Sequence, residues 1–405
     1  MAMGKPKIRF KGYEDAWEQR KLGEIYGSIG NAFVGTATPY YVEQGHFYLE
    51  SNNVKDGQIN HNSEIFINDE FYEKQKDKWL HTGDVVMVQS GHVGHAAVIP
   101  KELNNTVAHA LIMFRNPKEE IEPYFLNYEY QTDKVKKKIE NITTGNTIKH
   151  ILASDMQEFV VDVPKYEEQK VIASYFSHLD HLITLHQRKC EETKSLKKYM
   201  LQKMFPENGK CVPEIRFSGF SDAWEQRKLG EMIKEYKETV DSDCILPVLT
   251  SSKTEGVILQ EEHFGRKQQH DITGYNILPR NYCTYRNRSD GVDFTFNINK
   301  CCDKGIISKF YPVFSGNNSD VFFISLLLNN SDEIVQEIAY TCTGTGQKVL
   351  SFLDLQKMKI KVPNFEEQKK IAAYFDHLDH LITLHQHKCD ELQKLKKFML
   401  QNMFV

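Results

Sequence analysis

The sequence predicts an α+β protein in which two globular lobes are joined by two long antiparallel helices that form a coiled coil, as an internal pseudo-two-fold repeat. Three observations predict this. Two blocks of sequence occur twice, the segments between them differ, and the second block has the apolar spacing of a long helix. We expect a first lobe at 1–162, a first helix at 163–206, a linker and second lobe at 207–361, and a second helix at 362–405.

The repeated blocks form a frame around each lobe. The first block contains Ile8-Arg9-Phe10 and the run from Asp15 to Glu24, and it returns unchanged 207 residues later. The second block runs from Val163 to Phe205 and returns 199 residues later with 31 of 43 positions identical. Agreement of this extent in two separate blocks cannot arise by chance, so we interpret the chain as one module written twice.

The segments inside the frame share only traces of sequence. Thr144-Gly145 and Lys149 in the first lobe match Thr343-Gly344 and Lys348 in the second. A plain tandem duplication would let all parts diverge to a similar degree. Different inserts in a near-identical frame therefore indicate that the lobes recognise different things, while the frame meets the same partner twice.

The second block has a helical pattern. Apolar or small residues recur at alternating spacings of four and three, as in a helix that buries one face. A proline precedes the block, acidic residues open it and lysines lie near its end, all of which are typical of helix ends. A single helix of about 60 Å would not keep an apolar stripe exposed. The stripe consists of Ile172, Phe176, Leu179, Ile183, His186, Cys190 and Thr193, with its second copy at Ile371, Phe375, Leu378, Ile382, His385, Cys389 and Leu392.

The natural partner of each long helix is the other copy. Pairing of equivalent modules about a two-fold axis makes the helices antiparallel and places one lobe at each end of the pair. Two alternatives are independent helix-tailed domains and a coiled coil with an outside partner.

Two His and two Cys lie on the helical stripe near its midpoint. In an antiparallel pair the midpoints meet, so His186, Cys190, His385 and Cys389 are expected to approach one another. Such a set can hold zinc. A polar layer that fixes the register of the helices explains the same residues without a metal, and we predict no metal site.

The net charge is −4, which differs from the basic excess of most proteins that bind DNA by electrostatics alone. The first lobe, counted over 25–162, has 12 basic and 19 acidic side chains, and the second, over 232–361, has 15 and 16. If the lobes touch DNA, their basic groups must gather on one face or a partner must supply phosphate contacts.

Other features of the sequence indicate the cellular compartment in which the protein works. No apolar run approaches the length that spans a bilayer, and the first ten residues contain no apolar signal region. The eight cysteines include no C-x-x-C pair, so a zinc ribbon or a thioredoxin-like site is not expected. Thiols without a disulfide framework fit a reducing compartment. We expect a cytoplasmic protein with no membrane contact.

The motifs of the frame resemble those of the specificity (S) subunits of type I restriction-modification systems. Trp-Glu-Gln-Arg-Lys-Leu-Gly-Glu opens each lobe, and Pro-x-x-Glu-Glu-Gln-Lys opens each helix at Pro164 and Pro363. The first lobe also has Gly83-Asp84 before an apolar run and Thr144-Gly145-x-x-x-Lys149-His150, both similar to that family's recognition domains. The resemblance extends over nearly the whole chain, in order and in duplicate.

The resemblance implies a fold and a function. Each lobe would be a target recognition domain that reads one half of an asymmetric, interrupted site in double-stranded DNA, and the helices would set the spacing between the halves. The frame would dock two modification (methyltransferase) subunits, which methylate adenine with S-adenosylmethionine. Restriction (endonuclease/translocase) subunits, which use ATP and Mg²⁺, would join them. The chain itself would bind no cofactor and carry no catalytic residue.

The second lobe departs from the family pattern. By sequence, the stretch from Gly83 to Ser90 corresponds to Arg280 to Asn287, which lacks the Gly-Asp pair. Position 346 is Gly where the first lobe has Thr147. The contact residues of the second lobe are therefore less directly implied.

Motifs of catalysis do not appear. An adenine methyltransferase needs Asn, Asp or Ser before Pro-Pro-aromatic, and the nearest sequence, Thr38-Pro39-Tyr40, lacks the second proline. Gly344-Thr345-Gly346 is only a fragment of a nucleotide-binding glycine loop. No G-x-x-x-x-G-K-[ST] occurs. A DNA enzyme acting alone is thus disfavoured, and a coiled-coil scaffold without a nucleic-acid role is the alternative to a DNA-reading adaptor.

Three stretches of the first lobe have the chemistry of a DNA contact, in which phosphate contacts position the protein and base contacts specify the sequence. One follows a strand-like run, one is a lysine cluster (134, 136, 137 and 138) at an expected helix end, and one is the Thr-Gly loop. A solvated helix C-terminus also explains the lysines. The predicted contacts are Gln89, Ser90, His92, Lys137, Thr144, Asn146, Thr147 and Lys149.

Two stretches of the second lobe have similar chemistry. Arginine suits guanine and asparagine suits adenine in the major groove. Surface ion pairs of Arg286 and Arg288 with Asp290 and Asp293 are the simpler explanation of the arginines. Trp17 and Trp224 lie in the frame, so we predict core anchors rather than base-stacking rings. The predicted contacts are Tyr285, Arg286, Asn287, Arg288, Thr343, Thr345, Gln347 and Lys348.

Overall fold

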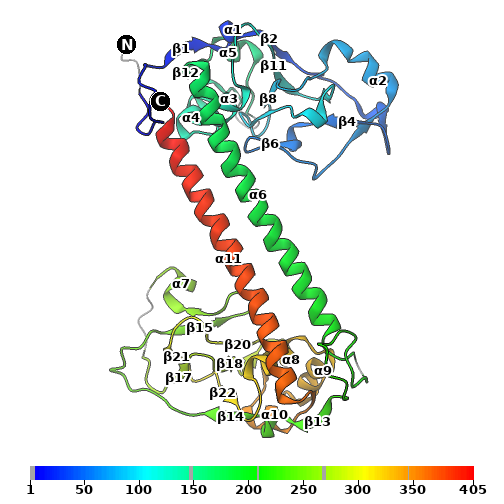
Figure 1. The fold of residues 1–405 in the computed structure, drawn as a ribbon, viewed down its shortest axis with the longest axis vertical. Helices are drawn as coiled ribbons and strands as arrows, with labels where there is room; N and C mark the ends of the chain where they lie inside the picture. Colours follow the sequence, from blue (N-terminus) through cyan, green and yellow to red (C-terminus); the bar gives the residue numbers. More distant parts are fainter. Residues whose placement is uncertain (1–4, 146–148, 208, 267–270, 345) are drawn as a thin grey trace. The chain divides into compact units, whose positions relative to one another are not determined.

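The computed structural model describes residues 5–145, 149–207, 209–266, 271–344 and 346–405. The chain divides into two compact units. Unit 1 comprises residues 1–187 and 386–405, and unit 2 comprises residues 188–385. Each unit contains one lobe and one part of each long helix (Figure 1).

The two long helices are α6, Tyr166–Lys203, and α11, Phe365–Met403, as predicted from the second block. In unit 1 the first part of α6 packs on the last part of α11. Asp180 forms an ion pair of 2.7 Å with Lys396, and the Phe176 ring lies 5.8 Å from the Phe404 ring. Residue numbers rise along one helix as they fall along the other, so the helices are antiparallel in unit 1.

Unit 2 repeats these contacts with the two repeats exchanged. Asp379, the counterpart of Asp180, pairs with Lys197, the counterpart of Lys396. The Phe375 ring lies 6.2 Å from the Phe205 ring. The predicted antiparallel pairing is confirmed within each unit.

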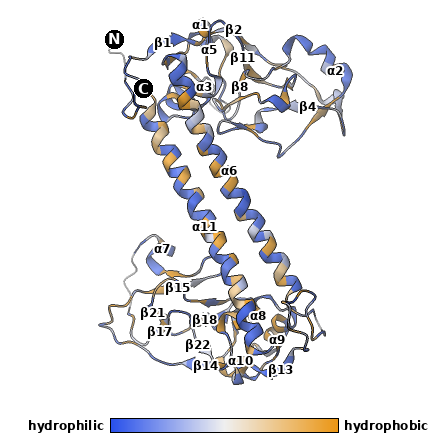
Figure 2. Ribbon diagram, viewed as in Figure 1, coloured by the Kyte–Doolittle hydropathy of each residue, from blue (hydrophilic) through white to orange (hydrophobic). Residues whose placement is uncertain are grey.

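Most of the apolar stripe of each helix is buried as predicted, and Figure 2 shows apolar residues alternating with polar ones along α6 and α11. The half-buried members of the stripe are His186, Thr193, Ile382 and His385. Cys190 and Cys389 are buried on this stripe. The Cys190 thiol faces the Ile382 carbonyl at 3.9 Å, and the Gln393 amide faces the Cys389 sulfur at 3.6 Å. Among the residues that the structure describes, no group of three or more His, Cys, Asp or Glu side chains is arranged to hold a metal ion.

The lobe of unit 1 is built on a four-stranded antiparallel sheet of order β2-β11-β8-β9. Its strand β8, Val-Val-Met-Val, is buried on both faces, because alternate side chains enter two different cores. One core is shared with α3, α4, α6 and α11, and the other lies towards a second, smaller sheet of order β10-β4-β7-β3. The elements before α6 are β1 (Glu18–Lys21), α1 (Leu22–Ile25), β2 (Tyr26–Asn31), η1 (Thr38–Tyr40), β3 (Tyr41–Val42), β4 (His46–Leu49), η2 (Ser51–Asn53), β5 (Val54–Lys55), β6 (Gln58–Ile59), β7 (Phe66–Ile67), α2 (Asp69–Lys74), η3 (Lys76–Lys78), β8 (Val85–Val88), β9 (Ala96–Val98), η4 (Lys101–Leu103), β10 (Val107–Ala108), β11 (Leu111–Pro117), α3 (Pro123–Glu129), α4 (Asp133–Ile142), α5 (Ala153–Glu158) and β12 (Val160–Val163).

The lobe of unit 2 has a central sheet of the same topology, β14-β22-β18-β20. The lobes differ outside this sheet, where unit 2 has the two-stranded pairs β15-β16 and β17-β21. The elements from the linker to α11 are β13 (Glu225–Lys228), η5 (Leu229–Glu231), β14 (Ile233–Tyr236), β15 (Leu249–Ser252), β16 (Gly256–Leu259), α7 (Gln260–Phe264), β17 (Asn276–Pro279), β18 (Cys283–Tyr285), β19 (Arg288–Ser289), β20 (Phe296–Ile298), β21 (Lys304–Ile307), β22 (Val313–Gly316), α8 (Val321–Asn330), α9 (Asp332–Thr341), β23 (Lys348–Val349), α10 (Phe352–Lys357) and β24 (Lys359–Val362).

Equivalent hydrogen bonds correct the sequence correspondence between the lobes by one residue. The Gly83 amide donates to the Ile99 carbonyl, and the Asn281 amide donates to the Asn299 carbonyl, both at 2.9 Å. Gly83 is therefore the counterpart of Asn281, rather than of Arg280. Both positions have left-handed backbone, with φ of 92° and 63°, which Gly and Asn tolerate better than other residues.

A buried ion pair explains why Arg9 and Glu168 recur. The Arg9 guanidinium donates two hydrogen bonds of 2.7 Å to the Glu168 carboxylate. Arg216 and Glu367 repeat this at 2.6 and 2.7 Å. Both carboxylates are buried, and a planar guanidinium satisfies both oxygens at once. The pair joins the first block of each frame to the first turns of its long helix.

The next residue of the motif positions the start of the helix. The buried Gln169 side chain accepts from the Glu122 amide at 2.9 Å and donates to the Pro164 carbonyl at 2.8 Å. Gln368 makes the equivalent bonds to Asp320 and Pro363. Glu-Glu-Gln is therefore a structural motif that ties each long helix to its lobe.

Trp17 and Trp224 are core residues, as predicted. The Trp17 ring packs edge-on against Phe125 and Phe404, and the Trp224 ring packs edge-on against Phe205 and Phe323. Phe404 belongs to the second repeat and Phe205 to the first. The core of each lobe is thus completed by the end of the other repeat's helix.

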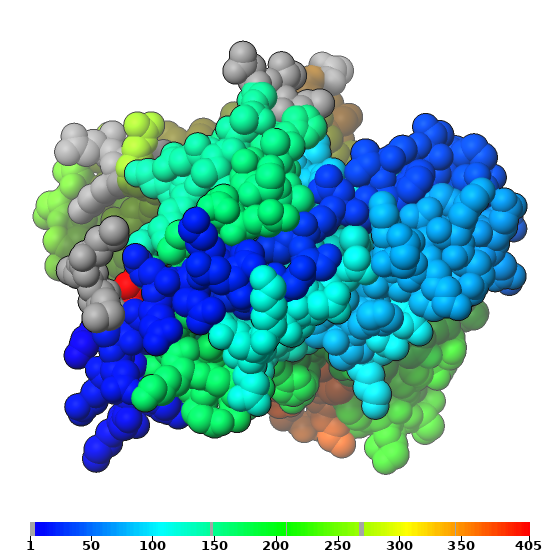
Figure 3. Space-filling view, turned by 90° about the horizontal axis from the view of Figure 1, so that it is seen from above, coloured from blue at the N-terminus to red at the C-terminus, as the bar shows by residue number. Residues whose placement is uncertain are grey.

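The N-terminal block lies on the surface of unit 1, where Figure 3 shows it in dark blue across the face that is viewed. Ion pairs hold its edges: Lys21 to Glu158 at 2.6 Å and Arg20 to Glu119 at 2.9 Å. Strand β1 pairs with β12, the strand that directly precedes α6 in the sequence. In unit 2, β13 pairs with β24, which directly precedes α11. None of the helices in the described ranges is long and apolar enough to cross a lipid bilayer.

Removing one partner of the buried ion pair leaves the other charge uncompensated. We expect Arg216→Ala to lower the free energy of unfolding of unit 2 by about 3–5 kcal/mol. Urea unfolding followed by circular dichroism measures it. The double variant Arg216→Met with Glu367→Leu removes both charges and should lose much less. Equal losses in the single and double variants would contradict a role for the charge pair.

Glu129 is a fully buried carboxyl group in unit 1 with one oxygen that lacks a hydrogen-bond partner among the described residues. Its other oxygen accepts from the Asp162 amide at 3.3 Å. Burial raises the pKa of Glu129 to about 8, opposed by that hydrogen bond. The group is therefore protonated in the folded protein at neutral pH and ionised in the unfolded chain.

This raised pKa makes unit 1 less stable as pH rises. Below the pKa of Glu129 in the unfolded chain, the stabilisation from the protonated Glu129 carboxyl is fully present. Between that pKa and pH 8, the folded state holds one more proton than the unfolded state. Stability falls by about 1.4 kcal/mol per pH unit at most over this window. Thermal unfolding of wild type and Glu129→Gln at pH 6 and pH 8.5 tests this. The variant should gain relative stability at pH 8.5, and identical pH profiles would contradict it.

Candidate nucleic-acid interface

The candidate stretches of the first lobe lie side by side in the structure. The residues after β8 run antiparallel to the end of the Thr-Gly loop. The Gly91 amide donates to the Lys149 carbonyl at 3.1 Å, and the Ile151 amide donates to the Gln89 carbonyl at 3.0 Å. Ser90 forms a bridge with His150 between these bonds. Two segments that are far apart in sequence thus form one surface.

The second lobe makes the same junction. The Leu350 amide donates to the Asn287 carbonyl at 3.0 Å, the counterpart of the bond from Ile151 to Gln89. Strand β19 then pairs with β23, with Arg288 opposite Val349. The backbone scaffold is shared, but the side chains are Gln-Ser-Gly in the first lobe and Asn-Arg-Ser in the second.

The Thr-Gly loops have the same closure in both lobes. Thr144 exchanges two backbone hydrogen bonds with His150, and Thr343 exchanges two with Val349. Gly145 and Gly344 have φ near 100°, and a Cβ on Gly344 would lie 2.3 Å from the Gln347 carbonyl oxygen. Only glycine fits this turn, which explains why Thr-Gly recurs in inserts that otherwise diverge. The candidates Asn146, Thr147 and Thr345 lie outside the described residues.

The lysine cluster lies at the start of a helix, which corrects the expectation of a helix C-terminus. Thr132 caps α4, so the lysines occupy its first two turns. Lys134 and Lys138 face the buried Asp162 at 3.6 and 3.9 Å, and Lys134 also donates to the Val405 carbonyl. Lys136 and Lys137 are exposed. Only part of the cluster is therefore directed to solvent.

A cavity of about 300 Å³ lies where the three candidate stretches of the first lobe meet, and we name it the β8–β9 cavity. His92 from the β8–β9 connection, Lys136 from α4 and Lys149 from the Thr-Gly loop all line it. The sequence pointed to His92, to Lys149 and, within the lysine cluster, to Lys136, but His95 and the Asp56-Gly57 turn were not predicted. The spacing His92-x-x-His95 was the available indication, because both residues belong to one short connection between strands.

A second cavity of about 430 Å³ lies beside the equivalent connection in unit 2, and we name it the β18–β20 cavity. Arg286 and Arg288 line it. The Arg288 guanidinium lies 4.5 Å from the centre of the Phe310 ring, a cation–π contact that orients it. Asp293 pairs with Lys253 at 2.5 Å, rather than with either arginine as the simpler explanation expected.

Tyr285 is a core residue, which removes it from the candidate contacts. Its side chain is fully buried, and its hydroxyl donates to the Leu350 carbonyl at 3.1 Å. Strand β18 is buried along its whole length, Thr284 included, and exposed positions begin only after it, at Arg286. Arg286 and Arg288 are exposed, Asn287 is half-buried, and Thr343, Gln347 and Lys348 in the neighbouring loop are exposed or half-buried.

In the first lobe, the remaining candidates are accessible. Thr144, Lys149 and His92 are exposed, and Gln89 and Ser90 are half-buried. The Lys149 amine is engaged by Glu140 at 2.6 Å, and a His92 ring nitrogen contacts the Ser51 carbonyl at 3.0 Å.

Comparison with known families gives the same match twice. The family model described as the type I restriction modification DNA specificity domain matches residues 14–195 and again residues 222–394. Each match begins in the first block of a frame and ends in the long helix that closes it. The two matches together span most of the chain.

Individual relatives agree with this result. The chain is 25% identical to the putative type I restriction enzyme MjaX specificity subunit of Methanocaldococcus jannaschii over 94% of this chain and 91% of that protein. It is 22% identical to the MjaVIII specificity subunit of the same organism, over 94% and 90%. The crystal structure of a type I restriction-modification S subunit from M. genitalium covers 99% of each chain at 14% identity with a TM-score of 0.64, a likeness of fold.

Proposed function

This chain belongs to the family of type I restriction-modification DNA specificity proteins, and from that premise we propose that each lobe reads one half of an asymmetric, interrupted DNA site. Specificity subunits of this family recognise DNA through two domains, and this chain contains two. What we propose is which surface of each lobe contacts the DNA. We assign the first half to the surface around the β8–β9 connection and the second to the surface around the β18–β20 connection.

The observation that carries this proposal is the shared junction with different side chains. A backbone scaffold common to both lobes holds Gln89-Ser90-Gly91 in one and Asn287-Arg288-Ser289 in the other, each beside a Thr-Gly loop. A reading surface needs a fixed geometry and variable donors and acceptors. Frame residues such as Arg9 and Trp17 make contacts inside the fold. The connections after β8 and β18 are therefore the parts that are both exposed and different between the lobes.

The exposed groups have the chemistry of both kinds of contact. Arg286 and Arg288 offer guanidinium forks that match the two acceptors of guanine in the major groove. Lys137 in the first lobe and Lys348 in the second offer point charges for phosphates. Because each lobe has at least as many acidic as basic groups, we propose that partner subunits supply further phosphate contacts.

The partners we propose are two modification subunits, which methylate adenine with S-adenosylmethionine, and restriction subunits, which use ATP and Mg²⁺. Methyl transfer and cleavage belong to these partners, and this chain contributes recognition. The helices α6 and α11 each run through both units, so we propose that they set the spacing between the half-sites.

A duplicated apolar surface supports docking of the same partner twice. Leu196 and Tyr199 are exposed on α6, one turn apart, and their counterparts Leu395 and Phe398 are exposed on α11. Exposed apolar residues that stand singly need no explanation, but a pair that recurs at equivalent positions of an identical block indicates a binding surface. We propose that each pair receives an apolar surface of one modification subunit.

Changing Arg286 to Ala tests the second reading surface. We expect a loss of about 1–3 kcal/mol in discrimination at one position of one half-site, since a bidentate contact to guanine is lost. Methylation kinetics of the reconstituted complex on duplexes with single-base changes measure this. Arg280→Ala is the matched control, because Arg280 pairs with Asp303 at 2.7 Å away from the cavity. A specificity profile identical to wild type in Arg286→Ala would contradict the assignment.

Changing Leu196 and Leu395 to Asp tests the docking surface. A charge at each site should weaken assembly with modification subunits by at least tenfold, because it would be desolvated in the complex. Native mass spectrometry of the mixture counts the subunits bound. Ser195→Asp with Lys394→Asp places a carboxylate at each of the two exposed neighbouring positions and should leave assembly intact. Full assembly of the Leu variant would exclude this surface.

A further inference from the structure

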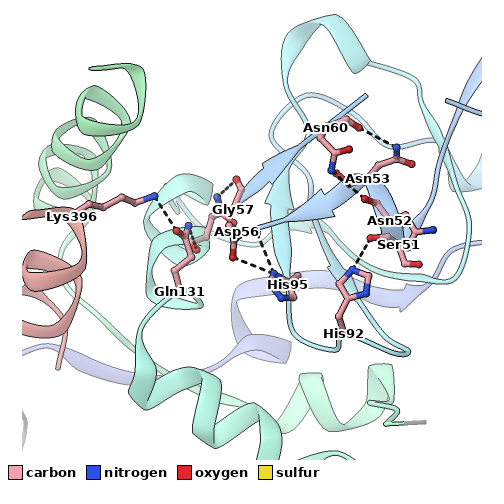
Figure 4. Close-up of polar contacts among 11 residues, drawn as sticks. Ser51, Asn52, Asn53, Asp56, Gly57, Asn60, His92, His95, Gln131 and Lys396 are labelled. Atoms are coloured by element: carbon pink, nitrogen blue, oxygen red, sulfur yellow. Dashed lines mark hydrogen bonds and ion pairs between the residues drawn. The ribbon is translucent and has the colours of Figure 1, made fainter. Parts of the chain in front are cut away.

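The β8–β9 cavity of unit 1 combines two histidines whose ring nitrogens are assigned by backbone partners (Figure 4). The Asp56 amide donates to His95 Nδ1 at 3.2 Å. A backbone N–H cannot accept, so Nδ1 carries no proton and the proton of the neutral ring lies on Nε2. His95 therefore has a hydrogen-bond donor at Nε2.

His92 has the opposite assignment. Its Nε2 contacts the Ser51 carbonyl at 3.0 Å, and a carbonyl oxygen only accepts. Nε2 therefore carries a proton, and Nδ1 is the acceptor in the Nε2–H tautomer. The two rings are neighbours in an edge-to-face arrangement, with centroids 5.3 Å apart. In these tautomers His92 offers an acceptor at Nδ1 and His95 a donor at Nε2, and both residues line the cavity.

The charges around the cavity are balanced. Lys136 and Lys149 line it together with Asp56 and Glu140, and Lys149 is already paired with Glu140. Burial lowers the pKa of His95, with nearby Lys136 and His92 acting in the same direction against Asp56, so its ring stays neutral at physiological pH. A balanced site that presents one donor and one acceptor suits an uncharged polar ligand better than a phosphate.

The walls of the cavity are fixed. Gly94 approaches Ile139 so closely that a Cβ would lie 2.9 Å from Ile139 Cγ2. The Asn127 amide donates to the Gly57 carbonyl at 2.8 Å, and Gln131, which also lines the cavity, accepts from Lys396 at 3.1 Å (Figure 4). Ile139 and the Tyr130 ring add apolar lining. Apolar and aromatic side chains beside a few polar groups are typical of sites for planar heterocycles.

We propose that the β8–β9 cavity binds one nucleobase that has an amino group beside a ring nitrogen, adenine or cytosine. The amino group donates to His92 Nδ1, and the ring nitrogen accepts from His95 Nε2. As a contact to DNA this rests on the proposed function, with the base taken from the first half-site after it leaves the stack. A free nucleobase or nucleoside has the same chemistry and is the other source.

His92→Gln is the informative variant. In His92→Gln the amide nitrogen can still donate to the Ser51 carbonyl, so the lobe keeps its internal bond, while the ring acceptor Nδ1 is removed. His61→Gln is the matched control, since His61 is an exposed histidine of the same lobe outside the cavity. The full chain is assembled with its modification subunits, and methylation is measured on duplexes in which each position of the mapped site is changed singly.

We expect His92→Gln to lose discrimination about 10- to 100-fold at a single adenine or cytosine of the half-site that Arg286→Ala leaves unaffected. 2-Aminopurine at that position should brighten when wild type binds. Adenosine and cytidine titrated into the chain alone test the second source. Nucleoside binding that His92→Gln abolishes, without change on any duplex, supports the nucleobase site with a free ligand.

Other outcomes overturn the inference. If His92→Gln lowers methylation equally on all duplexes and makes its salt dependence shallower, the cavity is a phosphate-binding site instead. An unchanged profile together with no nucleoside binding removes the site altogether. Failure of the proposed function is distinguishable, because then wild type itself shows no preference among the duplexes.

Discussion

The closure of each lobe's core by the other repeat's helix is the constraint on which the rest of the structure depends. Phe404, just after the end of α11, packs on Trp17, and Phe205, just after the end of α6, packs on Trp224. A lobe cannot bury its tryptophan without the far end of the partner helix, so the antiparallel pairing and the folding of both lobes are coupled. This coupling contributes to the near-identity of the frame, because residues such as Phe205 and Phe404 must each fit a core that belongs to the other repeat.

The identical frame leaves freedom elsewhere. The central sheets share topology and turn geometry, to the point that Asn281 adopts the left-handed backbone of Gly83. The connections that follow β8 and β18 are joined to the Thr-Gly loops by backbone hydrogen bonds, which place few demands on side chains. Sequence can therefore change at these connections without cost to the fold, as two lobes with different targets require.

Much of this architecture was predictable, because duplication and helical periodicity are properties of long segments. The helices, their antiparallel pairing and the burial of Trp17 were confirmed. Single side chains were harder to place. Tyr285 resembled a contact because of the polar residues that follow it, but it is the last residue of a strand whose side chains are all buried. The lysines near position 136 lie in the first turns of α4, because Thr132 caps the start of that helix. His95 was not predicted as a site residue, because its role depends on the backbone amide of Asp56, which is distant in sequence. Contacts between segments far apart in sequence leave no local pattern.

The central claim is that the lobes read their half-sites independently on a common scaffold. Residues 232–357 can be replaced by a copy of residues 25–158, which leaves both frames and both long helices in place. The measurement is a map of methylated adenines in DNA from cells that carry the altered chain and its partner subunits. The account predicts that the half-site of the first lobe now appears twice, in inverted orientation, around a spacer of the original length. Methylation that retains the original asymmetric site would contradict it.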